Sequence, residues 1–228
     1  MSDLEQQLSK IIAVVSGGID SVTMAYQLKS EGHTLHLVAV DYGQRHRKEL
    51  GFARLAAARL GFPYEEVDLT SARNIFRGSS LTDSAVEVPR GGGPSPDSPN
   101  IVPNRNAVLL SAGFALAVVE RAEAVAFGVM ADDVGPSDTS PEFLRAFLVM
   151  ERIATSGHAH PDLDLLAPLV KLHKREVVAL GDGLGVPWEE TWTCFRGEEV
   201  HCGECAACTE RREAFAAAGV HDPTAYAV

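Results

Sequence analysis

The first half of the chain alternates short, largely apolar runs with segments of helical period. Strands are predicted for "IIAVV" (11–15), "LHLVAVDYG" (35–43), "YEEVDL" (64–69) and "AVAFGV" (124–129). Helices are predicted for 20–30, 48–61 and 106–123, the second of them ending in a glycine suited to a helix C-terminus. This alternation predicts an α/β fold, a parallel sheet with helices on both faces.

The pattern is interrupted between residues 70 and 104. The stretch "RGGGPSPDSPNIVP" (90–103) is too rich in glycine and proline for a helix or a central strand. A loop of this length inside a compact domain is either functional or a disordered insertion. We expect a lid over a ligand site, with the disordered insertion as the alternative.

Length, composition and charge exclude some classes of protein. A chain of 228 residues is long enough for a single domain, 1–228, and its net charge of -11 argues against a broad surface for nucleic acid or an acidic membrane. The N-terminus lacks the pattern of a signal peptide, and the apolar runs fall short of the ~20 residues that span a bilayer. We therefore expect a cytoplasmic protein, in which disulfides are rare.

A glycine loop follows the first predicted strand. "SGGIDS" contains Ser16, Gly17, Gly18, Asp20 and Ser21, and it opens the first predicted helix. Glycines allow backbone amides to approach an anion, the serines add hydroxyl donors, and the helix N-terminus carries positive partial charge. The loop fits neither G-x-x-x-x-G-K-[ST] nor G-x-G-x-x-G. It resembles the pyrophosphate-loop ATPase signature and predicts ATP binding, with Asp20 meeting Mg²⁺.

Four cysteines lie near the C-terminus at a spacing of C-x7-C-x2-C-x2-C. The predicted metal ligands are Cys194, Cys202, Cys205 and Cys208. Four thiolates in one short segment suit tetrahedral zinc, although the spacing also fits an iron–sulfur cluster. A site closed by four sulfurs has no open position for catalysis, so we expect structural Zn²⁺ in a C-terminal element.

Several motifs together resemble those of the QueC family of queuosine biosynthesis, the 7-cyano-7-deazaguanine synthases. The motifs are "SGGIDS" (16–21), "DYGQRHRKEL" (41–50), "LTDSAVEVP" (81–89), "VPNRN" (102–106), "LGVPWEETWTC" (184–194) and "CGECAAC" (202–208). The resemblance implies a Rossmann-like (HUP-type) nucleotide-binding core at 11–180 and a zinc-binding, helical C-terminal element at 181–228. It also implies a homodimer.

The activity that the resemblance implies is that of an AMP-forming carbon–nitrogen ligase. Its substrates would be 7-carboxy-7-deazaguanine, ammonia and ATP, and the acid would pass through an adenylate and an amide to the nitrile. Two alternatives stay open. One is a similar ligase that stops at an amide with another amine, such as a protein amine in antiphage defence. The other is a non-enzymatic nucleotide-binding zinc module.

The resemblance also suggests residues for the active site beyond the glycine loop. Arg45 and His46 are candidates for contact with phosphate or with the substrate carboxylate, or else a solvated helix start. Arg105 and Asn106 are candidates for substrate binding that are also placed to cap a helix. Lys174 is a candidate for phosphate contact, or else a lone lysine at a helix start.

One segment departs from the family pattern. In "DDVGPSDTSPEF" (132–143), Thr139 and Ser140 stand where the family usually has cysteine and arginine, and one residue is missing. Asp138 is kept and is expected to accept hydrogen bonds from a guanine-like edge, and Asp132 is a further candidate for substrate binding. Asp132 or Asp133 is also a candidate for Mg²⁺. Serine cannot replace a bidentate arginine, so the change indicates either drift within the family or a changed substrate.

Overall fold

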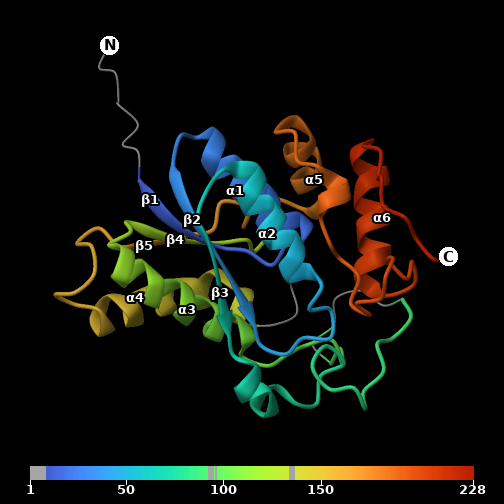
Figure 1. The fold of residues 1–228 in the computed structure, drawn as a ribbon, viewed down its shortest axis with the longest axis horizontal. Coiled ribbons are helices and arrows are strands. Elements are labelled where there is room, and N and C mark those ends of the chain that lie inside the picture. Colours follow the sequence, from blue (N-terminus) through green and yellow to red (C-terminus); the bar gives the residue numbers. More distant parts are fainter. Residues whose placement is uncertain (1–8, 92–94, 96, 134–136) are drawn as a thin grey trace.

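The computed structural model describes residues 9–91, 95, 97–133 and 137–228, and the N-terminal residues on which the expectation of no signal peptide rests lie outside them. Its centre is a parallel sheet in the order β3-β2-β1-β4-β5 (Figure 1). The strands are β1 (Lys10–Val14), β2 (Thr34–Asp41), β3 (Tyr64–Asp68), β4 (Ala124–Phe127) and β5 (Asp164–Leu166). The order reverses beside β1, where an open parallel sheet forms its ligand crevice.

Helices cover both faces of the sheet. On one face lie α1 (Ile19–Ser30), α2 (Glu49–Leu60) and α5 (Lys174–Gly183), and on the other α3 (Arg105–Glu120) and α4 (Pro141–Ala154). Successive residues of β1 serve the two cores alternately, because strand side chains point to opposite faces: Ile11 and Ala13 to the first, Ile12 and Val14 to the second. The predicted α/β architecture is confirmed.

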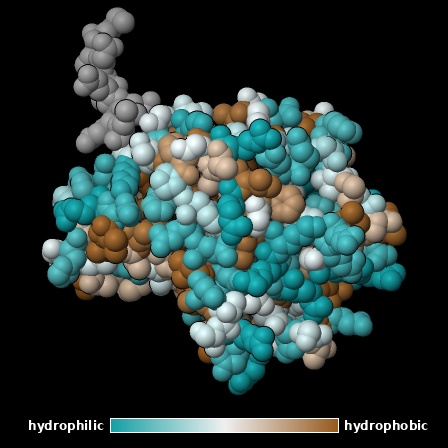
Figure 2. Space-filling view, in the orientation of Figure 1, coloured by the Kyte–Doolittle hydropathy of each residue, from teal (hydrophilic) through white to brown (hydrophobic). Residues whose placement is uncertain are grey.

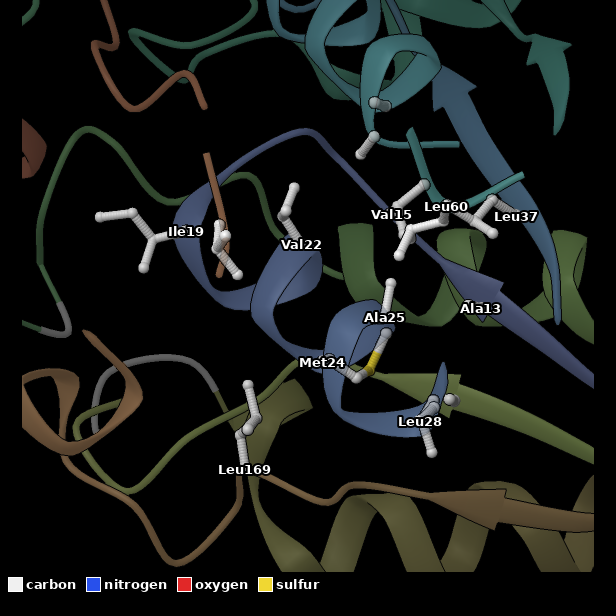
Figure 3. Close-up of a cluster of buried hydrophobic side chains, with 14 of the residues drawn as sticks. Ala13, Val15, Ile19, Val22, Met24, Ala25, Leu28, Leu37, Leu60 and Leu169 are labelled. Carbon is white, nitrogen blue, oxygen red and sulfur yellow. The ribbon is translucent and has the colours of Figure 1, made fainter. Parts of the chain in front are cut away.

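The first core is built around α1. Figure 3 shows Ile19, Val22, Met24, Ala25 and Leu28 of this helix among side chains of β1, β2 and α2. Each of these five residues is at most 2% exposed. At about 1.5 to 3 kcal/mol for each fully buried aliphatic side chain, such packing holds the start of α1 rigidly against the end of β1.

The C-terminal element consists of the short 3-10 helix η3 (Trp188–Glu190), the cysteine segment and α6 (Ala206–Ala218). Ala214 and Phe215 of α6 join the core that contains α1 and α5. Arg211 has no exposed surface, and its guanidinium donates to the carbonyl of Trp188 and the carboxylate of Asp222. A buried arginine with these partners fastens α6 to the segments before and after it.

The long 70–104 segment has more regular structure than expected, because it begins with the 3-10 helix η1 (Thr70–Phe76). A second short 3-10 helix, η2 (Ser137–Thr139), precedes α4. Hydrophilic residues predominate on the face shown in Figure 2, with smaller hydrophobic groups between them. Over the described part of the chain, no helix combines the length and the apolar character that crossing a membrane requires.

Candidate active site

A cavity of about 350 Å³ opens at the carboxyl ends of β1, β2 and β4. Its walls come from the glycine loop, the segment after β2, part of the 70–104 segment, the starts of α3 and α5, and the residues beside Cys194. The topology therefore collects most of the predicted site at the edge where open parallel sheets bind ligands.

The glycine loop forms one wall of this cavity. Gly17 has a φ of +87°, and a Cβ atom there would lie 2.3 Å from the carbonyl oxygen of Glu49. Only glycine fits, because both the backbone conformation and the close approach to α2 exclude a side chain. The Ser16 amide donates to Ser21 Oγ at 3.1 Å, and no side chain caps the N-terminus of α1. The amides of its first turn are therefore available for an anion.

Lys174 joins the glycine loop to the C-terminal element. Its ammonium lies 2.7 Å from Asp20 Oδ2 and 3.5 Å from Glu210 Oε2. Burial opposes the charge, but Asp20 and Glu210 outweigh it and raise the pKa of Lys174 above its ordinary value. Lys174 is therefore a fixed cation beside the helix N-terminus, and residues 154 positions apart in the sequence meet in one ion pair.

The side chain of Asp20 is only half used by this pair. Asp20 Oδ1 is buried and has no hydrogen-bond partner among the described residues. Burial, with the nearby Asp20 carboxylate, raises the pKa of Asp133 to about 6, and Asp133 Oδ2 accepts the Met130 amide at 2.9 Å. Asp20 and Asp133 are thus two neighbouring carboxylates beside Lys174, and carboxylate oxygens are the donors that suit Mg²⁺.

Asp132 lies outside the main cavity. Its oxygens accept the Lys174 amide and contact His173 Nδ1, both at 2.7 Å, at the start of α5. The turn after β4 sends Asp132 toward α5 and Asp133 into the cavity. The structure thus gives Asp132 a helix-capping contact and no contact with the main cavity, where the sequence predicted substrate binding.

Arg45 is also absent from the cavity wall. Its guanidinium donates to the carbonyl oxygens of Ser80, Asp83 and Val86, each at 2.9 Å. These contacts bind the 70–104 segment over the site, and Leu81 and Val102 of that segment line the cavity. This arrangement agrees with a cover over the ligand site, while the predicted phosphate or substrate contact of Arg45 has no counterpart in its position.

His46 lines the cavity next to an acid that the sequence interpretation missed. Its Nε2 lies 3.4 Å from Oε1 of Glu49, and that oxygen accepts the Gln44 amide at 3.1 Å. Burial, assisted by Arg105, lowers the pKa of His46 to about 4, so the ring is neutral. Burial raises the pKa of Glu49 to about 8, against the opposing effects of Gln44 and Arg105. The sequence signal that could have found Glu49 was its spacing from Gln44 and His46 within the motif "DYGQRHRKEL" (41–50).

The start of α3 brings Arg105, Asn106 and Asp138 together. The Asn106 amide donates to Asp138 Oδ2 at 3.0 Å, and Asn106 Oδ1 accepts from the Arg105 guanidinium at 3.0 Å. Asp138 therefore stabilises the positive end of this helix, and one of its oxygens is occupied by that bond. Arg105 lines the cavity close to Tyr42 and Glu49.

The segment that departs from the family pattern is only partly described, because residues 134–136 lie outside the described residues. Ser140 is the N-cap of α4, accepting the Phe143 amide at 3.1 Å, and Pro141 follows at the first helical position. Thr139 Oγ1 donates to the carbonyl of Asp133 at 2.8 Å. Both substituted residues thus have local structural contacts, and serine is a good helix N-cap where arginine is not.

The four predicted metal ligands converge. Cys194, Cys202, Cys205 and Cys208 are free and buried, and their sulfur atoms all lie within 4.8 Å of one another. Metal–sulfur bonds of about 2.3 Å in a tetrahedron separate the sulfurs by about 3.8 Å, and the Cys202 and Cys208 sulfurs are 3.9 Å apart. Backbone amides of Cys202 and Cys205 point at sulfur atoms. The donor set therefore fits a metal ion.

The cysteine site adjoins the cavity directly. Thr193 and Phe195 flank Cys194 and line the cavity, as do Ala207 and Glu210 of α6. Phe195 packs on the His46 ring with centroids 5.8 Å apart. A metal held by the cysteines would thus fix one wall of the cavity without reaching into it.

Comparison with known proteins identifies the family. The family model for the queuosine biosynthesis protein QueC matches residues 10–219. A 7-cyano-7-deazaguanine synthase from Rhizobium johnstonii is 46% identical and one from Allorhizobium ampelinum 44%, each over 95% of this chain and 92% of the relative. A solved structure from Methanocaldococcus jannaschii, a predicted subunit of tRNA methyltransferase, shares the fold alone, with a TM-score of 0.50 at 19% identity over 77% of this chain and 75% of that one. The resemblance seen in the motifs is confirmed: the chain belongs to the QueC family.

Proposed function

We propose that the protein is an ATP-dependent ligase that converts 7-carboxy-7-deazaguanine and ammonia to 7-cyano-7-deazaguanine. The observation that carries this proposal is the cavity itself, in which the glycine loop, Lys174 and Asp20 meet at the carboxyl edge of the sheet. The family and the names of its curated members supply the substrate. The cavity supplies the parts that an adenylation needs.

The phosphate side of the cavity is formed by α1 and Lys174. In this proposal Ser16, Gly17, Gly18 and Ser21 bind the pyrophosphate through backbone amides and hydroxyls, as the uncapped helix N-terminus supports. Lys174 stabilises negative charge as pyrophosphate leaves, because it is buried, fixed and positive. The substrate carboxylate attacks the α-phosphorus, and the bond to pyrophosphate breaks.

Two kinds of metal ion fit this chain. Asp20 and Asp133 would hold Mg²⁺, which when bound neutralises phosphate charge, and the unpartnered Asp20 Oδ1 supports this assignment. The four cysteines would hold Zn²⁺ in a structural site, since all four sulfurs are used and the site is buried.

The nitrile requires two activations and the loss of three protons. Ammonia attacks the acyl adenylate, AMP leaves and one proton is released, which gives the amide. The amide oxygen then attacks a second ATP, with release of pyrophosphate and a second proton. Loss of AMP and of the last N–H proton forms the nitrile. AMP leaves readily at neutral pH where hydroxide does not, which is why adenylation is used twice.

Arg105 is the proposed partner of the substrate's carboxylate. It lines the same cavity as Lys174, and although burial opposes its charge, Tyr42, Glu49 and Asp138 outweigh burial and raise the pKa of Arg105. A guanidinium suits a planar carboxylate because it donates two parallel hydrogen bonds. Asn106 and Asp138 would act through this arginine by fixing the start of α3.

The test is mass spectrometry of the products formed from 7-carboxy-7-deazaguanine, ATP, Mg²⁺ and ammonium. We expect 7-cyano-7-deazaguanine with two AMP and two pyrophosphate per nitrile, and no nitrile when ammonium is omitted. Accumulation of amide without nitrile would favour the ligase that stops at an amide. Absence of AMP with this substrate would overturn the proposal.

Two further predictions concern the oligomeric state and the cellular location of the protein. A homodimer is expected from the family, and Val119 of α3 and Val149 and Ile153 of α4 are exposed apolar residues on helices that cover the same face of the sheet, where an interface would bury them. Light scattering of the purified protein measures this. A cytoplasmic location is expected as well, where the four thiols stay reduced.

A further inference from the structure

One wall of the cavity contains a buried acid whose backbone packs against Gly17 of the glycine loop. Glu49 lies on the first turn of α2 with its side chain 11% exposed. The contacts of its carboxyl group with Gln44 and His46 are both made at Oε1, and within the described residues Oε2 is given no partner. His46 Nδ1, beside it, is buried and unpartnered. This wall of the cavity therefore has unused hydrogen-bond acceptors.

The walls near this acid include apolar and aromatic side chains, with Arg105 also close to it. Tyr42, Leu81 and Val102 form one buried cluster, and Phe195 packs on that cluster and on the ring of His46. All of them line the cavity. Apolar and aromatic walls with an acceptor near them have the chemistry of a pocket for a nucleobase, whose faces stack and whose edge forms hydrogen bonds.

Each of the other acids of the cavity contacts a protein group through one oxygen. Asp20 and Glu210 pair with Lys174, Asp133 accepts the Met130 amide, and Asp138 accepts the Asn106 amide. Asp138, which the sequence suggested for a guanine-like edge, thus has one oxygen bound to the helix that it caps. Glu49 also contacts its protein partners through one oxygen, and what favours it is its place near Tyr42 of the apolar cluster.

We propose that Glu49 is the specificity-determining residue that accepts the N1–H and 2-amino hydrogen bonds of the deazaguanine ring. This inference rests on the proposed function and names the residue that recognises its substrate. Two adjacent N–H donors match the two oxygens of a carboxylate, so the ionised acid is bound on both sides. The raised pKa of Glu49 supports this role, since the buried carboxyl holds a proton until donors arrive.

The adenine of ATP is the other ring that this pocket would accept, and the two are distinguishable. Adenine presents one donor next to an acceptor, which matches a glutamine amide as well as it matches a protonated acid. Glu49→Gln therefore removes the match to the deazaguanine edge and preserves a match to adenine. The substitution keeps the size of the side chain, and Glu189→Gln at an exposed position is the matched control.

The experiment measures binding of two acids, 7-carboxy-7-deazaguanine and its analogue without the 2-amino group, by calorimetry. We expect the native protein to prefer the amino compound by about 10- to 100-fold, the size of a hydrogen bond to a charged group. Glu49→Gln should lose that preference while its dissociation constant for AMP stays within about threefold, a change of under 0.7 kcal/mol. Thermal melting of each variant checks folding.

The outcomes separate this inference from the proposed function. Preference for the 2-amino compound retained in Glu49→Gln would overturn the role of Glu49 even if the native protein forms nitrile. Weakened AMP binding with the preference intact would assign the pocket to adenine instead. If Glu49→Gln does not fold, Glu49→Asp, which keeps the charge and shortens the reach, should lower the preference without abolishing it. A native protein that makes no nitrile would overturn the proposed function, whatever the variants bind.

Discussion

The glycine loop and the cysteine segment are both compact sequence motifs that border one cavity, yet they are built in opposite ways. The loop presents uncapped amides and an unpartnered carboxylate oxygen to the open side. The cysteine segment turns its four sulfurs inward, where each cysteine is at most 3% exposed. The first motif is arranged to contact a ligand that binds and is released in each turnover, and the second to hold a permanently bound ion.

This difference predicts that variants of the glycine loop should affect chemistry and that variants of the cysteine segment should affect folding. Asp20 lies at the surface of the cavity, on a helix already held by the apolar core of α1. Cys205 lies at the N-cap of α6 and is fully buried with three other thiols. Without an ion, four buried thiols make only weak hydrogen bonds and contacts with one another, so they stabilise the segment little.

The largest expected effect follows from removal of the metal. Cys205→Ser, or a strong chelator, should lower the melting temperature by roughly 10 °C or more, because binding of a structural ion stabilises the fold that holds it. The measurement combines thermal melting with metal analysis of the native protein and the variant. Substitution of Ser156, a small residue of the α4–β5 connection far from the cysteines in sequence, by alanine should leave both readings unchanged.

A native melting temperature together with an empty cysteine site would remove the structural role of the ion. Metal analysis also decides the ion itself, since zinc supports the proposed assignment and iron with inorganic sulfide would replace it. Neither result would change the finding that the four sulfur atoms lie within 4.8 Å of one another.

The next effect concerns the glycine loop. Asp20→Asn should lower the rate of AMP formation by about 10³-fold or more while changing the melting temperature by only a few degrees, because the amide still accepts from Lys174 but holds Mg²⁺ poorly. Steady-state assays and melting curves of the same samples measure both. Asp182→Asn, at an exposed position of α5, is the control.

Loss of stability as large as that of the cysteine variant, with turnover of the folded fraction intact, would contradict the division between the two motifs. Asp20 would then be a structural partner of Lys174, and the unpartnered Oδ1 would have no role in catalysis.

The strands and helices of the first half were predictable because each carries its own periodicity. β1, β2, β4 and α2 lie within two residues of the predicted bounds, and Gly61 ends α2 with a φ of +76°, as its position indicated. Both chemical motifs were predictable for a related reason: their ligands are neighbours in the sequence. A tight glycine turn or a pair of C-x2-C turns specifies its own geometry.

Contacts between distant segments were not predictable from periodicity or spacing. Arg45 binds backbone carbonyl oxygens 35 to 41 residues away. Every residue has a backbone carbonyl, so the sequence does not indicate which of them will accept such a bond. Glu49 looks like an exposed acid at a helix start until the 70–104 segment and Phe195 enclose it. The roles of Asp132 and Asp138 at helix ends likewise depend on where α5 and α3 begin.

A smaller effect tests whether the cysteine segment contributes only structure. Phe195 adjoins Cys194 yet faces the cavity, where it packs on His46. Phe195→Ala should raise the KM for 7-carboxy-7-deazaguanine by about 5- to 100-fold, the range for loss of one stacking contact with a base, while metal content and the KM for ATP stay near native values. Kinetics with each substrate and metal analysis measure this. A change confined to the KM for ATP would place adenine against Phe195 instead.

The smallest expected effect is a pH dependence at the wall of the cavity that contains Glu49. The pKa of Glu49 is about 8 in the free protein, where Gln44, His46 and Arg105 face the carboxyl group. Binding of two N–H donors favours the ionised form, so affinity for the deazaguanine should rise with pH and level off above about 9, by about tenfold in total from pH 7. Below the pKa the acid must release its proton on binding, so at pH 7 calorimetry in two buffers of different ionisation enthalpy should detect close to one proton released. Glu49→Gln should release none. Release of close to one proton that persists in this variant would overturn the assignment to Glu49, because Asp133, with a pKa of about 6, is mostly ionised at pH 7 and would release only about a tenth of a proton.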